Sequence, residues 1–530
     1  MRNGWILLAL LVTVSLGAAR CSPPAAGAAD GDGPEAQETT DADSPQELPP
    51  DDGTPPVMAG LTLYQNPDNG LAAIATFTTD EDARPGFVIY GPNGLVYRRH
   101  RFPGLARTHE IPIVGMRADT AYRIEVTAED QWGNIATAPA VDFVTDPLPA
   151  DFPPLVVTRS DPGRRCPGVT LFNVQVLPEV GFGLVMALDE TGEVVWYHRE
   201  GAIITDVQKL KNGNIIIIFA LHGLVEVDIM GREVNRWPAI RADLDSVHHS
   251  VEELPNGNLL FLSSEMRSLE GFPAPDGGET WNVVGDVVVE MDRYGSVVKK
   301  LSLFDLFDPY VYDDDCGFEG FWDTAYYVTG GTFDWTHANA AVWRQDTGQV
   351  LVSVRHLDLM AAIDWQSLTV DWVFGAGRDF CLDQGRWPCH QHAPSFLPDG
   401  RLLVYDNGNH RTDGPEATRV AVYHLNDSDS GNLRATQEWE YDGGEPYFAS
   451  IVGDADELSC GNLLITDGGL HDGDGVTFSR LREVTFPGEP QVLFEMVLHD
   501  NDGVQPRNIS LYRSVHLDSL YWGLQADPEP

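Results

Sequence analysis

The chain is poor in positive charge. Lys and Arg number 34 among 530 residues, against 80 Asp and Glu, so the formal net charge is −46. Nucleic-acid binding requires clustered Lys and Arg to neutralise phosphates, and electrostatic attachment to anionic lipids requires a polybasic segment. The composition therefore argues against a nucleic-acid-binding protein and against a polybasic membrane-surface protein.

Long apolar stretches are also scarce. One such stretch covers residues 5–16, follows Arg2 and precedes the small residues 17–19. This is the pattern of a secretory signal, which we expect over residues 1–21. No later stretch is long and apolar enough to span a bilayer. We therefore expect an exported protein, periplasmic or on the cell surface.

Cys21 comes just after the small residues 17–19, at the position of the acylated cysteine of a lipoprotein, although Arg20 stands where such signals have Gly, Ala or Ser. Two alternatives stay open. Lipidation of Cys21 would tether the chain to a membrane, whereas cleavage after Ala19 would release it. Residues 22–55 are mostly Ala, Pro, Asp, Glu, Gly and Thr, which predicts a disordered acidic tether.

Glycine and proline are abundant, at 52 and 36 residues, which favours an all-β chain with many turns. Residues 56–148 contain short alternating stretches, and Tyr122 stands where a sandwich has its corner tyrosine. We expect a fibronectin-III/Ig-like β-sandwich here. The expected strands lie at 61–64, 72–77, 86–90 and 122–128.

Residues 149–530 repeat a β unit made of two hairpins. The first hairpin is centred on a tight turn such as Asn-Gly or Asp-Gly, and it occurs at 207–219, 249–262, 337–354, 392–405 and around 459–461. The second hairpin is centred on Asp-x-x-Gly or a looser turn, and it occurs at 185–196, 225–237, 287–298, 360–372, 420–439 and 481–494. Two hairpins make a four-stranded blade, so six second hairpins predict a six-bladed β-propeller. The stretches 265–285 and 301–335 exceed what a blade needs and are expected to be loops over one face.

Three histidines fall near the start of the first strand of their repeats. His249 and His392 each precede their turn glycine by eight residues, and His337 precedes its own by eleven. First strands line the channel of a propeller, so these imidazoles should converge at one mouth. A single histidine in a strand is more often structural, but converging titratable groups in a concave site usually mark function.

Two further side chains suit an oxyanion. Asn339 lies two residues after His337, so on a strand both should face the same side. Arg355 ends the next strand, and its guanidinium forks onto a tetrahedral oxyanion and repels a metal dication. Zinc binding by the three histidines is the main chemical competitor. A surface Arg355 paired with a carboxylate is the other alternative.

Several strings resemble the bacterial arylsulfate sulfotransferases. They are His249 with Leu254-Pro255-Asn256-Gly257, Asp334-Trp335-x-His337-x-Asn339, Ser353-Val354-Arg355-His356 and Gln391-His392. The similarity covers most of residues 150–530. It implies a six-bladed propeller that transfers a sulfuryl group from an aryl sulfate ester to a phenol without a nucleotide donor (PAPS). We expect no cofactor and no metal, and small-molecule partners only.

The resemblance also implies roles. His392 would be the nucleophile that becomes sulfurylated, which predicts ping-pong kinetics. The side chains that would bind the sulfuryl oxygens and assist proton transfer are His249, His337, Asn339 and Arg355. Thr466 is the candidate for a threonine that the family has on its last blade. His248 adjoins His249, but only His249 has the repeat offset.

A disulfide near the nucleophile is a further feature of the family, and the resemblance assigns it to Cys381 and Cys389. Cys166, Cys316 and Cys460 are then left without a pairing that the sequence can supply. The aromatic stretch 304–335 is expected to wall a pocket or to form a packed lid.

Two other classes of function remain open. One is a metal-dependent or lyase-type propeller enzyme that uses the same histidines. The other is a non-catalytic secreted propeller that presents its loops to a partner. The fold alone does not separate them, because propellers serve all three purposes.

Overall fold

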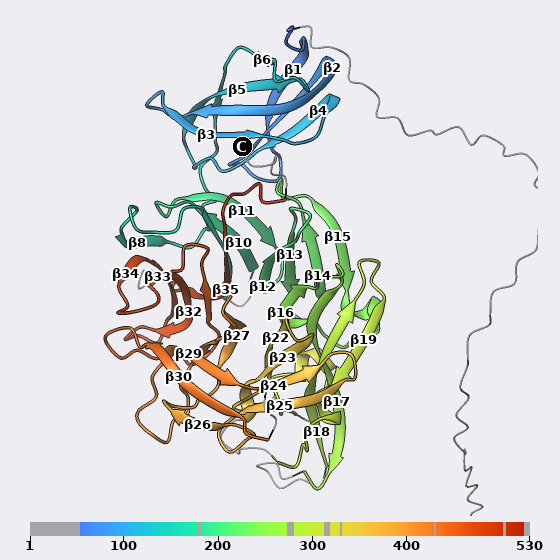
Figure 1. Ribbon diagram of the computed structural model, residues 1–530, viewed down its shortest axis with the longest axis vertical. Coiled ribbons are helices and arrows are strands. Elements are labelled where there is room, and N and C mark those ends of the chain that lie inside the picture. The colour runs from blue at the N-terminus through green and yellow to red at the C-terminus, as the bar shows by residue number, and fades with distance from the viewer. Residues whose placement is uncertain are drawn as a thin grey trace, which may run out of the picture. The chain divides into compact units, whose positions relative to one another are not determined.

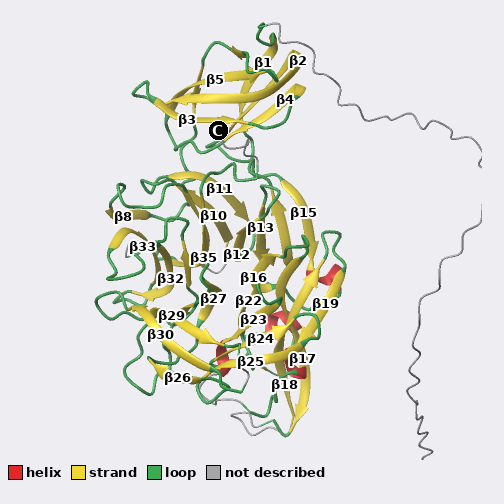
Figure 2. Ribbon diagram, in the orientation of Figure 1, coloured by secondary structure: helices red, strands yellow, loops and turns green. Residues whose placement is uncertain are grey.

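Nearly all regular structure in the protein is β-strand, as the computed structural model shows (Figure 2). The structure describes residues 53–177, 182–272, 280–311, 318–328, 331–428, 431–501 and 505–523. The expected signal, most of the expected tether, Cys21 and Cys316 lie outside these residues. Within them, no helix has the length and apolar composition of a membrane span, and the one α-helix, α1 (Asp323–Tyr326), has four residues.

The first seven strands form the expected sandwich. They are β1 (Met58–Gln65), β2 (Ala73–Tyr90), β3 (Val96–Arg101), β4 (Ala106–Ile113), β5 (Ala121–Glu129), β6 (Ile135–Thr137) and β7 (Val141–Val144). The strands expected at 72–77 and 86–90 are parts of β2, which pairs with β1 and β4 through its first part and with β3 and β5 through its second. The Tyr122 hydroxyl accepts a 2.9 Å hydrogen bond from the Arg117 N–H, as a corner tyrosine does.

Six further sheets form the blades of the expected propeller (Figure 1). From the innermost strand outward, blade 1 is β35 (Asn508–Leu517), β9 (Val169–Leu177), β10 (Phe182–Leu188) and β11 (Val194–Glu200). Blade 2 is β12 (Ile204–Lys209), β13 (Ile215–Phe219), β14 (Gly223–Val227) and β15 (Glu233–Pro238). Blade 3 is β16 (His248–Glu253), β17 (Leu259–Glu270), β18 (Thr280–Met291) and β19 (Val297–Ser302), with β21 (Thr332–Asp334) beside β18 and β20 (Phe318–Glu319) beside β21.

The other three blades follow the same plan. Blade 4 is β22 (Ala338–Arg344), β23 (Gln349–Val354), β24 (Leu359–Asp364) and β25 (Thr369–Gly375). Blade 5 is β27 (His392–Phe396), β28 (Leu402–Asp406), β29 (Arg419–Asn426), β30 (Arg434–Tyr441) and β26 (Cys381–Gln384). Blade 6 is β31 (Asp454–Glu457), β32 (Leu463–His471), β33 (Thr477–Val484), β34 (Val492–Leu498) and β8 (Leu155–Ser160). In the described part of the chain, three short 3₁₀ helices connect strands: η1 (Ala239–Ala242), η2 (Leu303–Asp305) and η3 (Arg355–Leu357).

The ring closes with strands from both ends of the propeller sequence. β35 is the innermost strand of blade 1 and pairs with β9, while β8 is the outermost strand of blade 6 and pairs with β34. The first hairpin of blade 1 is therefore split between distant segments. This explains why the sequence shows six second hairpins but only five first hairpins.

Apolar clusters fill the spaces between neighbouring blades. Leu260 and Leu262 of blade 3 pack with Val350 and Val352 of blade 4, and all four side chains are buried. Further clusters lie between blades 1 and 2, 2 and 3, 4 and 5, 5 and 6, and 6 and 1. Removing these side chains from water stabilises each blade against the next, so the ring is held by burial around its whole circumference.

The expectation of a loop over residues 265–285 was wrong. β17 and β18 have 12 residues each and pair along their whole length, from Leu259↔Met291 to Glu270↔Thr280. The hairpin extends beyond the blade because Trp281 and Val283 continue its buried face. β21 then pairs with β18 in parallel, which returns the chain to the start of blade 4.

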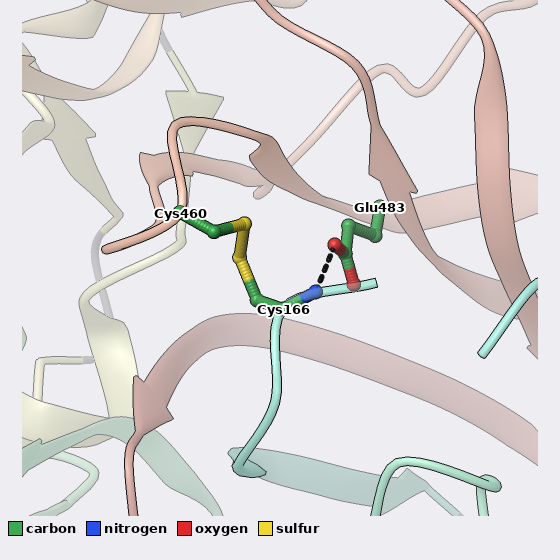
Figure 3. Close-up of side chains that lie close together, drawn as sticks. All are labelled: Cys166, Cys460 and Glu483. Atoms are coloured by element: carbon green, nitrogen blue, oxygen red, sulfur yellow. Dashed lines mark hydrogen bonds between the residues drawn. A yellow bond between two sulfur atoms is a disulfide. The ribbon is translucent and has the colours of Figure 1, made fainter. Parts of the chain in front are cut away.

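The disulfide of the described chain joins Cys166 to Cys460, with Cα atoms 5.6 Å apart (Figure 3). Cys166 lies between β8 and β9, and Cys460 lies between β31 and β32, so the bond links the segments on either side of the ring seam. The Cys166 N–H donates a 2.8 Å hydrogen bond to the buried Glu483 carboxylate, which Figure 3 shows beside the bond.

The predicted disulfide between Cys381 and Cys389 is contradicted, because both thiols are free. Cys381 begins β26 at the outer edge of blade 5, whereas Cys389 precedes β27 at the inner edge of the same sheet. Adjacent strands are about 4.8 Å apart, so strands at opposite edges of a five-stranded sheet are far beyond the reach of a disulfide.

We predict that the double substitution Cys166→Ser and Cys460→Ser lowers the free energy of unfolding by about 2–4 kcal/mol, because the bond restricts the unfolded chain. Urea unfolding of the full chain measures this change. Cys381→Ser is the matched control and should unfold like the parent protein. An unchanged unfolding midpoint in the double variant would show that the bond adds nothing to ring closure.

Candidate active site

A cavity of about 670 Å³ lies where the innermost strands of the blades begin. Its volume is in the range of small-molecule sites. Successive blades contribute to its lining, beginning with Gln175 of blade 1 and Leu221 of blade 2 and ending with Tyr512 on the strand that closes the ring. A ligand in this cavity would therefore contact segments that are far apart in the sequence.

The structure brings four of the sequence-predicted residues together in this lining. They are His249, His337, His392 and Arg355. The imidazole centroids of His249 and His337 are 4.9 Å apart, and the Tyr512 ring lies 5.6 Å from His249 and 6.0 Å from His392. The repeat offsets predicted that three imidazoles meet at one mouth of the channel, and the three line one cavity together with Arg355.

Asn339 and Thr466 are not among the described residues that line the cavity. The Asn339 Nδ2–H donates to the backbone oxygen of Gln391 at 2.7 Å, directly before His392. The Thr466 hydroxyl is fully buried and lies 2.7 Å from the Ser514 hydroxyl. Both side chains therefore connect neighbouring blades. Their positions do not support the expected contact with a substrate.

The backbone explains why Asn339 does not accompany His337. The strands β16, β22 and β27 each show a register shift at their start, and His249 and His337 have φ angles of 59° and 46°. Such bulges redirect side chains, and left-handed residues other than glycine cost about 1–3 kcal/mol each. The strict alternation that the sequence argument assumed begins only after these residues.

His392 is held by an amide of known orientation. The Asn407 Nδ2–H₂ donates to the backbone oxygens of Ala449 and Val452, at 2.8 and 2.9 Å, so its Oδ1 faces His392 Nδ1 at 2.6 Å. An amide oxygen only accepts hydrogen bonds, so Nδ1 of His392 carries the proton. The lone pair is then on Nε2, which makes this nitrogen the nucleophilic atom of the ring.

His337 is held in the same manner by a carboxyl group. Its Nδ1 lies 2.5 Å from Asp334 Oδ2, and the Trp322 indole N–H donates to the other oxygen of Asp334 at 2.9 Å. An ionised carboxylate accepts only, so it holds the proton on Nδ1 and leaves Nε2 with a lone pair. His249 makes its Nδ1 contact with His248, whose side chain also lines the cavity.

Burial and neighbouring cations keep these imidazoles neutral. Desolvation, followed by the charge of Arg355, lowers the pKa of His337 to about 3 and lowers the pKa of His392 well below 6.5. The pKa of His249 is also lowered well below 6.5, by desolvation first and then by His248. Neutral imidazoles can act as nucleophile or base without waiting for deprotonation.

Apart from Gln175 and Thr205, the rest of the lining is apolar or aromatic. Phe321 and Trp322 come from the stretch that was expected to wall a pocket or form a lid, and both line the cavity. In the same stretch Tyr310 and Tyr327 are exposed, so only part of it forms the wall. The remaining apolar contacts come from Leu221, Ile451, Val452 and Tyr512. An aromatic ring fits such a lining.

One group of described residues in this region has the side-chain types and spacing of metal ligands. Ligand atoms of Asp334, His337 and His356 all lie within 4.8 Å of one another, and the three side chains are buried. Only His337 of the sequence-predicted histidines belongs to it. A dication here would have to replace the Asp334–His337 hydrogen bond, and the charge of Arg355 acts on both imidazoles. The residues present suit a neutral hydrogen-bonded cluster better than a metal.

Sequence comparison agrees with this geometry. The family model described as Arylsulfotransferase (ASST) matches residues 160–513, which is more than half of the 530 residues. The chain belongs to the arylsulfotransferase family. The model described as Arylsulfotransferase Ig-like domain matches residues 67–145, which contain most of the sandwich.

Family membership assigns the activity in outline. The protein is a sulfotransferase that moves a sulfuryl group from an aryl sulfate donor to a phenol and needs no PAPS. The resemblance stated from the sequence is confirmed, as are the all-β class and the six-bladed propeller.

Among curated proteins none matches the chain. Among solved structures, a luciferin-regenerating enzyme is 9% identical and aligns over 65% of this chain and 95% of its own, with a TM-score of 0.34. Kluyveromyces lactis Hsv2 is 8% identical over 75% and 95% of the two chains, with a TM-score of 0.28. BamB from Moraxella catarrhalis is 10% identical over 69% and 81%, with a TM-score of 0.26. TM-scores this low carry no argument about function.

We predict that the buried His337 makes stability depend on pH. Its pKa is about 3 in the folded chain and about 6.5 when unfolded, so below pH 6.5 the unfolded chain binds the proton more strongly. Stability is therefore complete above pH 6.5 and falls as the pH drops towards 3. Between pH 7 and pH 5, protonation of His337 in the unfolded chain should lower the free energy of unfolding by about 2 kcal/mol. Urea unfolding at the two pH values measures this change.

The free energy of unfolding of the variant His337→Asn should fall less over the same pH range, whatever its value at pH 7. His222→Asn, at an exposed position, is the control. Parallel pH profiles for His337→Asn and the parent would contradict the assignment of a neutral, desolvated imidazole.

Proposed function

We propose that this enzyme transfers the sulfuryl group in two steps through a covalent intermediate on His392. The observation that carries the proposal is the 2.6 Å hydrogen bond between His392 Nδ1 and Asn407 Oδ1. It fixes the proton on Nδ1 and the lone pair on Nε2, in a ring that lines the cavity together with Arg355.

In the donor step, Nε2 of His392 attacks the sulfur of the aryl sulfate. The new N–S bond forms as the bond between sulfur and the aryl oxygen breaks, and the electron pair leaves with that oxygen as a phenolate. The imidazole becomes positively charged on sulfurylation, and its Nδ1–H still donates to Asn407. A neutral nucleophile attacks an anionic ester without charge repulsion, which the lowered pKa of His392 provides.

Arg355 would bind the non-bridging oxygens. Its side chain is 2% exposed and lines the cavity, and one terminal N–H₂ group donates to the Ser450 backbone oxygen at 3.2 Å. That contact fixes the guanidinium plane. A desolvated guanidinium stabilises charge that develops on the sulfuryl oxygens, as cationic clamps do in phosphoryl transfer.

In the acceptor step, a phenol enters the same aromatic cavity and attacks sulfur with its oxygen. The O–S bond forms, the N–S bond breaks, and the phenol proton passes to an imidazole with its lone pair on Nε2, His249 or His337. His392 regains its lone pair. Since the bases are neutral and close to His392, both steps can occur in one cavity.

We predict that incubation with 4-nitrophenyl sulfate, without an acceptor, adds one acid-labile SO₃ group to the intact protein. His392→Ala should show no such adduct and should lose at least about 10³-fold in turnover, because the nucleophile is absent. Intact-mass spectrometry and release of 4-nitrophenolate measure both effects.

His109→Ala is the matched control, because His109 is a buried histidine of the sandwich strand β4. It should form the adduct at the parent rate. An undiminished adduct or turnover in His392→Ala would overturn the assignment of the nucleophile.

A metal-dependent enzyme is the second candidate, favoured by the grouping of Asp334, His337 and His356. We predict that the purified enzyme keeps its full activity after dialysis against a chelator, since the sulfuryl transfer described above needs no dication. Metal analysis accompanies the assay. Loss of activity on chelation, with recovery on adding zinc, would favour the metal enzyme instead.

We also propose that the enzyme works outside the cytoplasm. The Cys166–Cys460 disulfide supports this, because such bonds persist in oxidising compartments. Lipidation of Cys21 remains a proposal that labelling with a fatty-acid analogue would test.

A further inference from the structure

A second histidine lies behind His249. The Nδ1 atoms of His248 and His249 are 2.7 Å apart, and Nε2 of His248 is 3.2 Å from Asp286 Oδ1. His248 and Asp286 are only 2% and 1% exposed and His249 is half-buried, and both histidines line the cavity. Asp286, His248 and His249 therefore form a chain of contacts from the protein interior to the cavity.

The distances determine where the protons lie. At 2.7 Å one proton must stand between the two Nδ1 atoms, because two lone pairs or two N–H groups would repel each other. The contact of His248 Nε2 with Asp286 is close but lacks hydrogen-bond geometry. A lone pair 3.2 Å from a carboxylate oxygen would be repelled, so we place a hydrogen on Nε2 of His248. A neutral His248 then has its lone pair on Nδ1, and the shared proton belongs to His249. His249 consequently offers a lone pair at Nε2.

We propose that His248 and Asp286 store the proton that passes between the two substrates. When Nε2 of His249 takes the proton of the acceptor phenol, the Nδ1 proton of His249 shifts to Nδ1 of His248. Only N–H and O–H bonds change: His249 ends neutral with its hydrogen on Nε2, and His248 becomes an imidazolium beside Asp286. The reverse shift delivers the proton to the phenolate that leaves the next donor. This inference rests on the sulfuryl transfer proposed above.

The surrounding charges favour transfer of the proton from His249 to His248. Burial disfavours a positive charge on the His249 ring, and the permanent charge of the Arg513 guanidinium adds to this effect. His248 instead faces the Asp286 carboxylate and interacts electrostatically with Asp334. The carboxylate beside His248 and the guanidinium near His249 therefore both favour the movement of positive charge from His249 towards Asp286.

The Asp286 carboxylate, which lies beside the charged form of His248, is itself held by hydrogen bonds. The other oxygen of Asp286 accepts hydrogen bonds from the Thr336 hydroxyl and the Ala338 N–H, both at 2.5 Å. The His248 ring also packs edge-on against Trp322, with centroids 5.3 Å apart. His248 acts through His249, so it is a positioning residue that also holds a proton.

The substitution His248→Gln tests the proposal, because a glutamine amide can still accept from His249 and donate to Asp286 but cannot carry the proton. With 4-nitrophenyl sulfate, whose leaving group needs no proton, the donor step should stay within about threefold of the parent. With phenyl sulfate as donor, and with phenol as acceptor, the same variant should be about 10²-fold slower. Stopped-flow and quenched-flow measurement of the two half-reactions separates these values.

If His248→Gln slows the donor step equally with 4-nitrophenyl sulfate and with phenyl sulfate, the role of His248 is structural. If it slows neither reaction, His248 has no role in proton transfer. Either result overturns the proposal. His109→Gln is the matched control and should leave all three rates unchanged. If the parent enzyme forms no adduct on His392, the proposed function fails, and that failure is seen in the parent before any variant is compared.

A measurement on the parent enzyme keeps the proposal testable if His248→Gln does not fold. Neutron diffraction of the full chain at neutral pH should show the shared hydrogen bonded to His249 Nδ1 and none on its Nε2. A hydrogen on Nε2 of His249 in the absence of substrate would overturn the proton assignment.

Discussion

The site depends on one repeated interaction, a hydrogen bond to Nδ1 of each cavity histidine. Its partners are Asn407 for His392, Asp334 for His337 and His248 for His249. This bond fixes the rotation of each ring. It holds the proton on Nδ1 of His392 and His337, and the proposed proton placement at His248 does the same for His249, so each lone pair is on Nε2. Without it a buried neutral imidazole could adopt either tautomer, and nucleophile and base would not be defined.

Each partner lies close to its histidine. Asn407 follows β28, which pairs with the strand that begins at His392, Asp334 lies three residues before His337, and His248 adjoins His249. Hydrogen bonds between blades then fix the histidine segments against one another, as Asn339 does for the residue before His392. The left-handed backbone at His249 and His337 is tolerated because packing and hydrogen bonds from both sides hold it.

Much of this arrangement was predictable because the fold repeats. Equal offsets from the turn glycines placed His249 and His392 at equivalent positions, and ring symmetry then implied that they meet. Asn339 was misplaced because alternation along β22 fails at the register shift, which no local pattern announces. Asn407 and Tyr512 were missed because their role arises only from tertiary contacts. The cysteine pairing failed because residues close in sequence lie at opposite edges of one blade.

The closing strand has a consequence for synthesis. β35 supplies Tyr512 to the cavity wall and the innermost strand of blade 1, yet it follows every other strand in the sequence. While the ribosome is still making the preceding blades, β9 has no inner neighbour and the cavity lacks part of its wall. A nascent chain therefore holds all three imidazoles before it can enclose an aromatic ring, and catalytic competence arises in a single late event.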